Sequence, residues 1–439
     1  MRNVNTKRKS WNYGGDYEKG EHNDQNFCTN GVISADRTTK PATEECKYVF
    51  APIAFSTLSA HTGKIIITNR NFFTNTDNYR FFWQLRDEDS VLQEGEISVP
   101  STPAGESFEA NIPVKDFKAE EGAEYWLRLR AELRTDNLYA KAGFEVAWEQ
   151  FEYLSLPKAE TVKTNEAGLN VDDSNKNSIK ISGKGFNMEI NDGYISGYSL
   201  GNSEIIKSTL KPNFWRASTD NDWRGWKADR IMKFWITAAE KLKTASIDVR
   251  KTDSGCNIKV LKTIDNLVSV SLTYNVSSDG IIGVDYSFVK SPSLPELIRI
   301  GMQGEFSNKL NNITYYGRGP WENYSDRLAS AMVGVYKTTP SEMGFDYVVP
   351  QENANRCDVR WMSLQTKSKG GIMIVGNEPL SVSVWEFTQK ALEDAKHINE
   401  KVKNGNLTVN IDHAQAGVGG TDSWSLKARP AVDKRLLRW

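Results

Sequence analysis

The sequence predicts a mostly β protein in which a small antiparallel sandwich precedes a much larger one. Three observations predict this fold class. Short runs in which apolar and polar side chains alternate with a period of two recur along most of the chain. Polar turns separate these runs. The length of 439 residues is also too great for a single ordinary core, so two or more units are expected.

The first unit is predicted at residues 46–157. Residues 64–69 are rich in β-branched side chains and are followed by polar breakers. Residues 79–86 are aromatic and stop at an acidic turn, and residues 125–133 alternate between apolar and charged side chains. Short strands separated by polar turns at this spacing are typical of an immunoglobulin-like sandwich.

The second unit is predicted at residues 158–439, beyond a polar, lysine-containing boundary at 156–177. Its strands are too many for a small sandwich and predict a large two-sheet antiparallel one. Residues 11–45 show no sustained period and are expected to be loop, whereas 226–242 and 391–402 have helical spacing. Clear strand patterns of the second unit lie at 178–182, 185–190, 268–275, 281–289 and 372–375.

Composition excludes several classes of partner. The formal net charge of −1 is unlike the basic footprint of a nucleic-acid-binding protein and gives no attraction to anionic membranes. No apolar run reaches the roughly 18 residues of a membrane span. The basic residues near the start are not followed by the apolar stretch of a secretory signal, which predicts a cytoplasmic location. Four widely spaced cysteines are expected to be free thiols: Cys28, Cys46, Cys256 and Cys357.

Motifs for nucleotide binding, zinc proteolysis and serine hydrolysis are absent from the sequence. Three polar and aromatic segments stand out instead, at 23–31, 213–222 and 315–327, and further polar residues follow at 350–356. Such residues are costly to bury without partners, so each segment is either a functional loop or a structural joint. An aromatic content of 11% fits a protein that stacks sugars on its rings, although aromatic residues also favour strand cores.

These segments, taken in order, carry a resemblance to one enzyme family. Residues 11–39 resemble the end of a catalytic (β/α)8 barrel, and NFWRASTDND at 213–222 resembles the entry into that family's last domain. YYGRGPWENYSDR at 315–327 with VVPQENANR at 348–356 is similar to the signature of that domain, and GVGGTDSWS at 417–425 to a loop that returns to the active site. The family is the β-galactosidases of glycoside hydrolase family two.

The resemblance implies a fold and an activity. It implies that residues 1–45 are a barrel remnant and that the large sandwich is of the galactose-mutarotase-like, super-sandwich type. The family hydrolyses terminal non-reducing β-D-galactose residues with retention, using two glutamates about 5 Å apart across the glycosidic bond. Both glutamates precede the segment that matches residue 11. The chain is therefore expected to contain no catalytic residue and to be inactive alone.

The resemblance carries over three site residues. The backbone carbonyl of Phe27 and the side chain of Asn30 match positions that hold a sodium ion near the galactose 6-hydroxyl. Oxygen ligands suit a hard cation, but a further carboxylate ligand would come from upstream of this chain. Trp424 matches an aromatic platform at the acceptor-sugar subsite. A magnesium ion is expected only in the complete enzyme.

Four other carboxylates could be considered as a substitute acid and base, but the family gives them structural roles. We expect arginines to pair with them, and a paired carboxylate stays ionised, which suits a scaffold better than a proton donor. The last domain also resembles the aldose-epimerase sandwich, although no convincing His/Glu pair supports epimerisation. The carboxylates are Asp220, Asp222, Glu322 and Glu352, and the expected partners are Arg216, Arg318, Arg327 and Arg356.

Three functions remain open from the sequence. The chain could act as the structural and acceptor-subsite portion of a β-galactosidase, with the barrel supplied in cis or in trans and with homo-oligomer contacts. It could be an independent carbohydrate-binding module for β-galactoside sugars, or an inactive remnant of a truncated gene. Residues 1–10 and 427–439 depart from the family pattern, as expected of a truncated or separately encoded fragment. The barrel segment at 11–39 favours the first and third functions.

Overall fold

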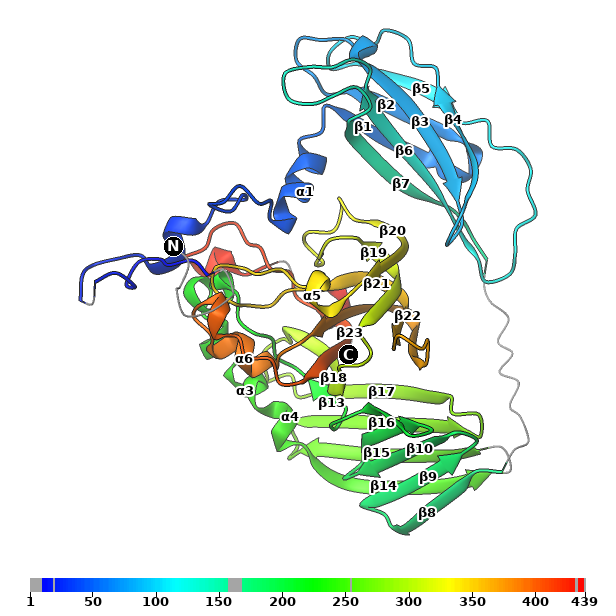
Figure 1. The fold of residues 1–439 in the computed structure, drawn as a ribbon, viewed down its shortest axis with the longest axis vertical. Helices are drawn as coiled ribbons and strands as arrows, with labels where there is room; N and C mark the ends of the chain where they lie inside the picture. The colour runs from blue at the N-terminus through cyan, green and yellow to red at the C-terminus, as the bar shows by residue number, and fades with distance from the viewer. Residues whose placement is uncertain (1–9, 19, 157–167, 253–254, 431–432, 438–439) are drawn as a thin grey trace.

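The computed structural model describes residues 10–18, 20–156, 168–252, 255–430 and 433–437. Antiparallel β structure dominates, as predicted, and Figure 1 shows a small sandwich at one end of the molecule and a larger body at the other. Within the described part of the chain, no helix is long and apolar enough to cross a membrane. The basic residues Lys7, Arg8 and Lys9 and the boundary residue Pro157 lie outside the described residues.

The small sandwich packs a three-stranded sheet, β1-β2-β5, against a four-stranded sheet, β4-β3-β6-β7. Alternate residues of each strand face inward, so Leu85, Leu127 and Leu129 are fully buried between the sheets. The predicted immunoglobulin-like sandwich and its three predicted strands are confirmed. The strands are β1 (Ile53–Ser59), β2 (Lys64–Asn69), β3 (Tyr79–Arg86), β4 (Val91–Ile97), β5 (Ser107–Asn111), β6 (Glu124–Leu133) and β7 (Glu145–Ser155).

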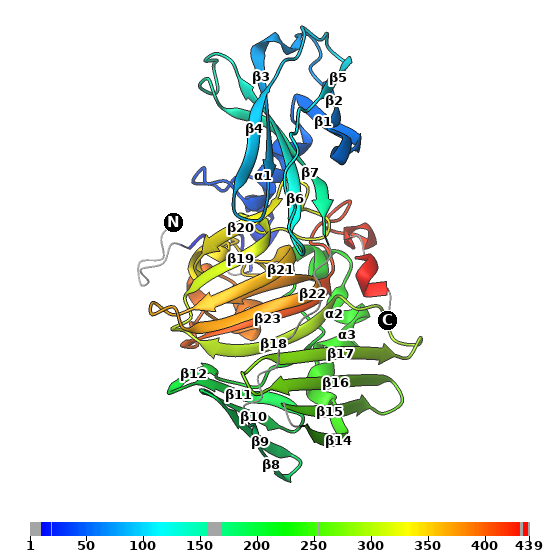
Figure 2. The same ribbon diagram turned by 90° about the vertical axis from the view of Figure 1, so that its right-hand side faces the viewer.

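The large sandwich joins a 12-stranded sheet to a four-stranded one. Figure 2 shows the long sheet running from β20 through β18 to β8, with the β14–β17 sheet beside its lower part. Ile181 and Met188 of the long sheet share one apolar core with Val260 and Leu272 of the short one. The long sheet contains β8 (Asn170–Asn175), β9 (Ser178–Gly183), β10 (Phe186–Asn191), β11 (Tyr194–Leu200), β12 (Ser203–Ile206), β13 (Lys211–Asn213), β18 (Arg299–Ser307), β19 (Asn312–Gly319), β20 (Met332–Thr338), β21 (Arg356–Gln365), β22 (Gly371–Trp385) and β23 (Asn406–Gln415). The short sheet contains β14 (Lys243–Thr252), β15 (Gly255–Ile264), β16 (Val268–Ser277) and β17 (Ile282–Lys290).

The strand predicted at 372–375 is confirmed as part of β22 (Gly371–Trp385), whereas the two predicted helical segments need correction. The helical spacing at 226–242 yields three single turns, α2 (Ala228–Ile231), α3 (Lys233–Ile236) and α4 (Ala238–Lys241), because the backbone leaves helical geometry at Met232 and Thr237.

The segment at 391–402 is likewise not one helix. Thr388 caps α6 (Gln389–Asp394), which ends before a separate 3-10 turn, η5 (Ile398–Glu400). The expected loop at 11–45 contains the 3-10 turn η1 (Gln25–Thr29) and the start of a helix, α1 (Pro41–Val49). Proline at the first helical position favours this start, since its missing N–H would be unpaired there. The predicted junction at residue 45 falls within α1, and the domain boundaries themselves stay predictions.

Polar contacts join the two sandwiches. Gln150 of β7 donates to the carbonyl of Val333 at 2.8 Å and accepts from its N–H at 2.7 Å, so its amide extends the edge of β20. The indole N–H of Trp126 reaches the hydroxyl of Tyr316 at 3.0 Å, and that of Trp148 reaches the carbonyl of Ser330 at 3.0 Å. These bonds are buried or half-buried, where an unpaired donor is costly, so they hold the sandwiches in one arrangement. All four cysteines are free, as predicted.

Replacing Gln150 with alanine should weaken the junction by about 1–2 kcal/mol, because both backbone groups of Val333 lose their partner. We expect urea unfolding, followed by tryptophan fluorescence and circular dichroism, to separate into two transitions further apart than in the wild type. Gln93→Ala is the matched control, since Gln93 makes the same reciprocal pair with Lys115 inside the small sandwich. Equal transition spacing in the two variants would contradict this role of Gln150.

Candidate functional site

A histidine cluster fixes the N-terminal segment to the large sandwich. The ring of Tyr13 stacks on that of His397 with 4.7 Å between centroids, and its hydroxyl donates to the carbonyl of Lys396 at 2.7 Å. His397 Nε2 lies 2.8 Å from Asp16 Oδ2, and Nδ1 lies 2.9 Å from Glu400 Oε1. Residues far apart in the sequence thus hold the segment around Tyr13 and Asp16 beside η5.

The electrostatics of this cluster favour a protonated histidine. Burial alone would lower the pKa of His397, but hydrogen bonds and the charges of Asp16 and Glu400 outweigh it and raise that pKa. Burial alone would raise the pKa of Asp16 and of Glu400, but their hydrogen bonds outweigh it and lower the pKa of both carboxyl groups. A charged imidazolium between two carboxylates is therefore the stable state at mildly acidic pH.

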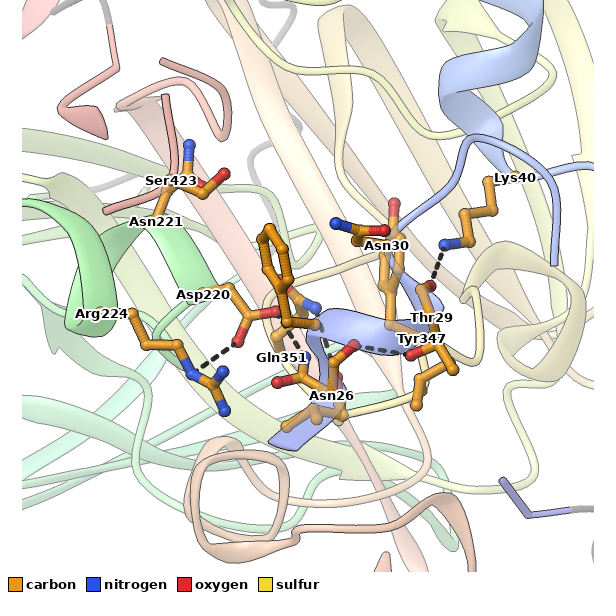
Figure 3. Close-up of a pocket in the computed structure, with 13 residues that line it drawn as sticks. Asn26, Thr29, Asn30, Lys40, Asp220, Asn221, Arg224, Tyr347, Gln351 and Ser423 are labelled. Atoms are coloured by element: carbon orange, nitrogen blue, oxygen red, sulfur yellow. Dashed lines mark hydrogen bonds and ion pairs between the residues drawn. The ribbon is translucent and has the colours of Figure 1, made fainter. Parts of the chain in front are cut away.

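The 3-10 turn η1 forms one wall of a polar hollow. Asn26 donates its amide to Asp220 Oδ2 at 2.6 Å, and Asp220 pairs with Arg224 at 3.6 Å, as Figure 3 shows. At the other end Lys40 Nζ donates to the carbonyl of Thr29 at 3.1 Å. Burial lowers the pKa of Lys40, and the charge of Asp220 opposes that effect. The hollow measures about 220 Å³ and is lined by Asn26, Phe27, Thr29, Asn30, Lys40, Asp220, Asn221, Arg224, Tyr347, Val348, Val349, Gln351 and Ser423.

Buried Arg216 connects the two loops on the opposite wall. Its Nε and Nη2 donate to Asp222 at 3.0 and 2.9 Å, and Asp222 also accepts from the N–H of Thr219 at 3.0 Å. Arg216 further donates to the carbonyls of Ala416 and Gly417 at 2.7 and 2.8 Å. One side chain thus ties the turn at Asn221–Gly225 to the loop that follows β23.

Two aspartates shape the loop at 417–425. Asp326 accepts from the N–H groups of Val418 and Gly419 at 3.1 and 2.8 Å. A Cβ on Gly417 would collide with the Asp326 carboxylate, so this close approach requires glycine. Asp422 accepts from the N–H groups of Trp424 and of the residue after it, at 3.2 and 2.9 Å. These bonds keep the loop ordered while the Trp424 side chain stays 70% exposed.

Exposed aromatic rings surround a second, more open hollow of about 480 Å³. The rings of Phe27 and Trp424 meet edge to face, with 6.1 Å between centroids. Trp223 lies on the same hollow, and the guanidinium of Arg224 sits 4.7 Å from its ring centroid. Flat indole faces beside a cation and amide groups can stack the apolar face of a sugar and bond its hydroxyls.

The structure brings the predicted site residues to one face. Phe27 and Asn30 line the polar hollow, and Phe27 shares the aromatic hollow with Trp424. Sequence reasoning missed Trp223 and Arg224, although both directly follow the segment at 213–222 that it singled out. The available signal was their position directly after this polar and aromatic segment, although most of the segment itself is buried.

The predicted sodium site is incomplete within this chain. Asn30 and the carbonyl of Phe27 offer two oxygen donors, fewer than a hard cation takes. Among the described residues, no group of three or more histidine, cysteine or acidic side chains could hold a metal ion. The residues present therefore do not by themselves fit a sodium or magnesium site, and the metal ligands Phe27 and Asn30 stay predictions.

Two of the predicted arginine pairs are confirmed and two are wrong. Arg216 pairs with Asp222 at 2.9 Å, and Arg327 pairs with Glu322 at 2.7 Å. Arg318 instead pairs with Asp358 at 2.6 Å, because Asp358 lies on the neighbouring strand β21. Arg356 donates to the hydroxyl of Tyr315 at 3.0 Å and to backbone carbonyls. Of the four candidate carboxylates, Asp220 alone lines either hollow: Asp222, Glu322 and Glu352 are buried in structural contacts.

Glu352 belongs to a buried charged cluster around Arg299. Arg299 donates to Asp412 Oδ2 at 2.9 and 2.7 Å and to Glu352 at 3.3 Å. Burial raises the pKa of Asp412 and of Glu352, although Arg299 opposes the shift in both. The N–H of Glu352 also donates to the carbonyl of Ala217 at 3.0 Å. The cluster therefore links β18 and β23 to the segment that carries Arg216.

Similarity to known proteins extends over nearly the whole chain. Residues 182–435 match the family described as Beta galactosidase small chain, residues 65–154 match Beta-galactosidase, domain 4, and residues 1–55 match Glycosyl hydrolases family 2, TIM barrel domain. A β-galactosidase of Priestia megaterium is 31% identical over 422 residues, and the match covers 95% of this chain and 40% of that protein. One of Psychromonas ingrahamii is 29% identical over 97% of this chain and 42% of that protein. The chain thus spans about two fifths of the length of these relatives.

The histidine cluster predicts a pH-dependent contribution to stability. Because the folded pKa of His397 is raised, its contribution is full below the unfolded value of about 6.5 and is lost as the pH rises through the folded pKa. Asp16 and Glu400 have lowered pKa values in the folded state. They therefore stabilise the fold at pH values above their unfolded pKa, and this stabilisation is lost as the pH falls through the folded pKa. The melting-temperature difference between wild type and His397→Gln should therefore be largest near pH 5.5–6 and should shrink above it. A difference independent of pH would exclude the charged bridge.

Replacing Arg299 with alanine should cost roughly 3–5 kcal/mol in the free energy of unfolding, because Asp412 and Glu352 would stay buried without their cation. Denaturant unfolding measures this loss. Arg80→Ala is the control, since its pair with Glu96 is exposed and should contribute little. Similar unfolding midpoints for the two variants would show that the buried cluster is not needed for stability.

Proposed function

We infer, because this chain belongs to the β-galactosidase small-chain family, that it forms the C-terminal portion of an enzyme that hydrolyses terminal non-reducing β-D-galactose residues. The observation that carries this proposal is the aromatic hollow. Phe27 comes from the region that matches the barrel domain, whereas Trp223 and Trp424 come from the region that matches the small chain. Residues that meet at the junction of two domains commonly form a ligand site.

The role we propose for this portion is to hold the acceptor side of the substrate. Trp424 and Trp223 would stack on the sugar or aglycone that leaves or accepts the galactosyl group, and Arg224 would bond its hydroxyls. The face is rigid, since Arg216 and Asp326 fix both loops from behind. A rigid platform loses little conformational entropy when a sugar binds, which favours affinity.

Catalytic carboxylates are proposed to come from the remainder of the barrel. Retention requires two carboxyl groups about 5 Å apart that face the glycosidic bond. In the part of the chain that the structure describes, the candidate carboxylates are instead paired with arginines, and three of them are buried away from both hollows. Ions such as sodium or magnesium, a cytoplasmic location and homo-oligomeric assembly are further proposals for the complete protein.

Hydrolysis of a chromogenic β-galactoside tests the proposal. The chain should be inactive alone and should support turnover when combined with the barrel-containing N-terminal part of the Priestia megaterium relative. Turnover by the chain alone would overturn the assignment of the catalytic groups. No turnover in either case would leave two alternatives, which a galactose-binding measurement separates: an inactive remnant and the second candidate function, an independent sugar-binding module.

The exposed platform is the observation that favours this second candidate. Three exposed aromatic rings on one hollow could bind a galactoside without any catalytic partner. Titration of galactose and lactose against tryptophan fluorescence separates the two functions. Saturable binding by the chain alone, together with inactivity in the mixture, would identify a binding module.

In the active combination, Trp424→Ala should weaken acceptor-sugar binding about tenfold, because a stacking surface is lost. Formation of the galactosyl intermediate should stay close to the wild-type rate, since Trp424 is placed on the acceptor side. Transglycosylation kinetics with added glucose measure both quantities. Tyr139→Ala removes an exposed aromatic ring from the small sandwich and serves as the control. Loss of galactosylation with the fold preserved would show that Trp424 is placed wrongly.

A further inference from the structure

Three phenylalanine side chains are displayed together where α1 enters the small sandwich. Phe50, Phe72 and Phe73 are 79, 86 and 97% exposed, and they line one shallow hollow of about 620 Å³. The rings of Phe72 and Phe73 lie 6.3 Å apart. Single exposed apolar residues are ordinary, but a shared patch of aromatic rings marks an interaction surface.

The turn that carries these rings is ordered. Fully buried Asn69 donates its amide to the carbonyls of Thr74 and Thr102, at 2.9 Å each, and its side-chain oxygen accepts from Asn71 at 2.8 Å. The N–H of Arg70 donates to the carbonyl of Pro52 at 2.8 Å, which joins this turn to the segment after Phe50. A buried amide with three partners thus holds the turn with its phenylalanines exposed to solvent, and a partner surface would offset the free-energy cost of exposing these apolar rings.

The neighbouring chain indicates what covers them. Residues 1–55, which include α1 and Phe50, match a TIM barrel domain, yet no residue of α1 is buried. Val32 and Ile33, just before α1, are about half exposed, and the carbonyl of Val32 accepts from the hydroxyl of Thr43 at 2.8 Å. A (β/α)8 barrel encloses its strands within a ring of helices, so these residues lack most of the structure that would cover them.

We propose that Phe50, Phe72 and Phe73 form a docking surface for the outer helices of the remaining barrel, an inference that rests on the proposed function. The occupant is the rest of the barrel, because the patch continues directly from a helix that matches that domain. The relatives, which are more than twice as long as their matched part, have room for it. The small sandwich then packs against the barrel through these apolar side chains, in addition to the covalent connection through Ala51 and Pro52.

A chimera tests this surface. The N-terminal part of the Priestia megaterium relative is joined to residue 11 of this chain, and hydrogen exchange is measured at residues 70–74. We expect stronger protection there in the chimera than in the chain alone, and no change at 137–139, where Leu138 and Tyr139 are also exposed. Protection of 70–74 in the chain alone that rises with concentration would instead identify a second copy as the occupant and overturn the proposal.

The double variant Phe72→Ser/Phe73→Ser adds a second readout. It should leave the melting temperature of the chain alone unchanged, because both rings are exposed, and lower that of the chimera by several degrees. Leu138→Ser is the control and should change neither. Equal effects of the double variant in chain and chimera would overturn the docking surface.

Hydrolysis by the chimera separates this proposal from the proposed function. Turnover without added protection at 70–74 would overturn the docking surface and support the proposed function. Added protection without turnover would support the docking surface and count against the proposed function. If the chimera does not fold, analytical sedimentation measures whether the separately purified N-terminal part and this chain associate. Weaker association of the double variant than of the wild type supports the surface, and equal or absent association overturns it.

Discussion

The candidate site depends on one buried guanidinium. Arg216 donates to Asp222 with two nitrogens and to the carbonyls of Ala416 and Gly417, so four hydrogen bonds converge on a side chain with no exposed surface. The planar fork of arginine matches a carboxylate with two parallel bonds, which a lysine could not do. Because the two loops it joins carry Trp223 and Trp424, the separation of these indoles follows from the geometry of Arg216.

The buried ion pairs of this protein contribute more to fixing the positions of loops than to the free energy of folding. Moving ions out of water costs several kcal/mol each, and their attraction offsets that cost only where the hydrogen bonds are complete. Arg299 donates three hydrogen bonds to Asp412 and Glu352, but among the described residues Asp412 Oδ1 has no hydrogen-bond partner, so the cluster does not fully meet this condition. The N–H of Glu352 donates to the carbonyl of Ala217, next to Arg216, which links the cluster to that segment. Apolar side chains of equal volume would also fill the core, but they would form no directional hydrogen bonds to hold the neighbouring loops in one position.

The N-terminal segment depends on contacts that no local pattern contains. Tyr13 and Asp16 meet His397 across more than 380 positions of sequence, and Asn26 meets Asp220 across 194. These contacts place a segment that matches one domain against a body that matches another. The hollow between them therefore has walls from both matched regions, and ligand sites commonly occur at such junctions between domains.

The sequence by itself determined the fold class and singled out the polar segments. The alternation in 125–133 and the aromatic run at 79–86 are local properties of the sequence, and both predicted strands were confirmed. Phe27, Asn30 and Trp424 were found through motif resemblance, and the structure places them on one face.

Tertiary structure decided the partners. Arg318 meets Asp358 and Arg299 meets Asp412 because the pairing of strands that are distant in sequence brings their side chains together. The helical pattern at 226–242 broke into three turns because Trp226, Met232, Trp235 and Ala238 had to follow the core of the sandwich. Trp223 was also missed, because a chain read residue by residue does not reveal which exposed ring will lie beside Trp424. Local periodicity is set by backbone geometry, whereas partners are set by which distant surfaces can be buried together.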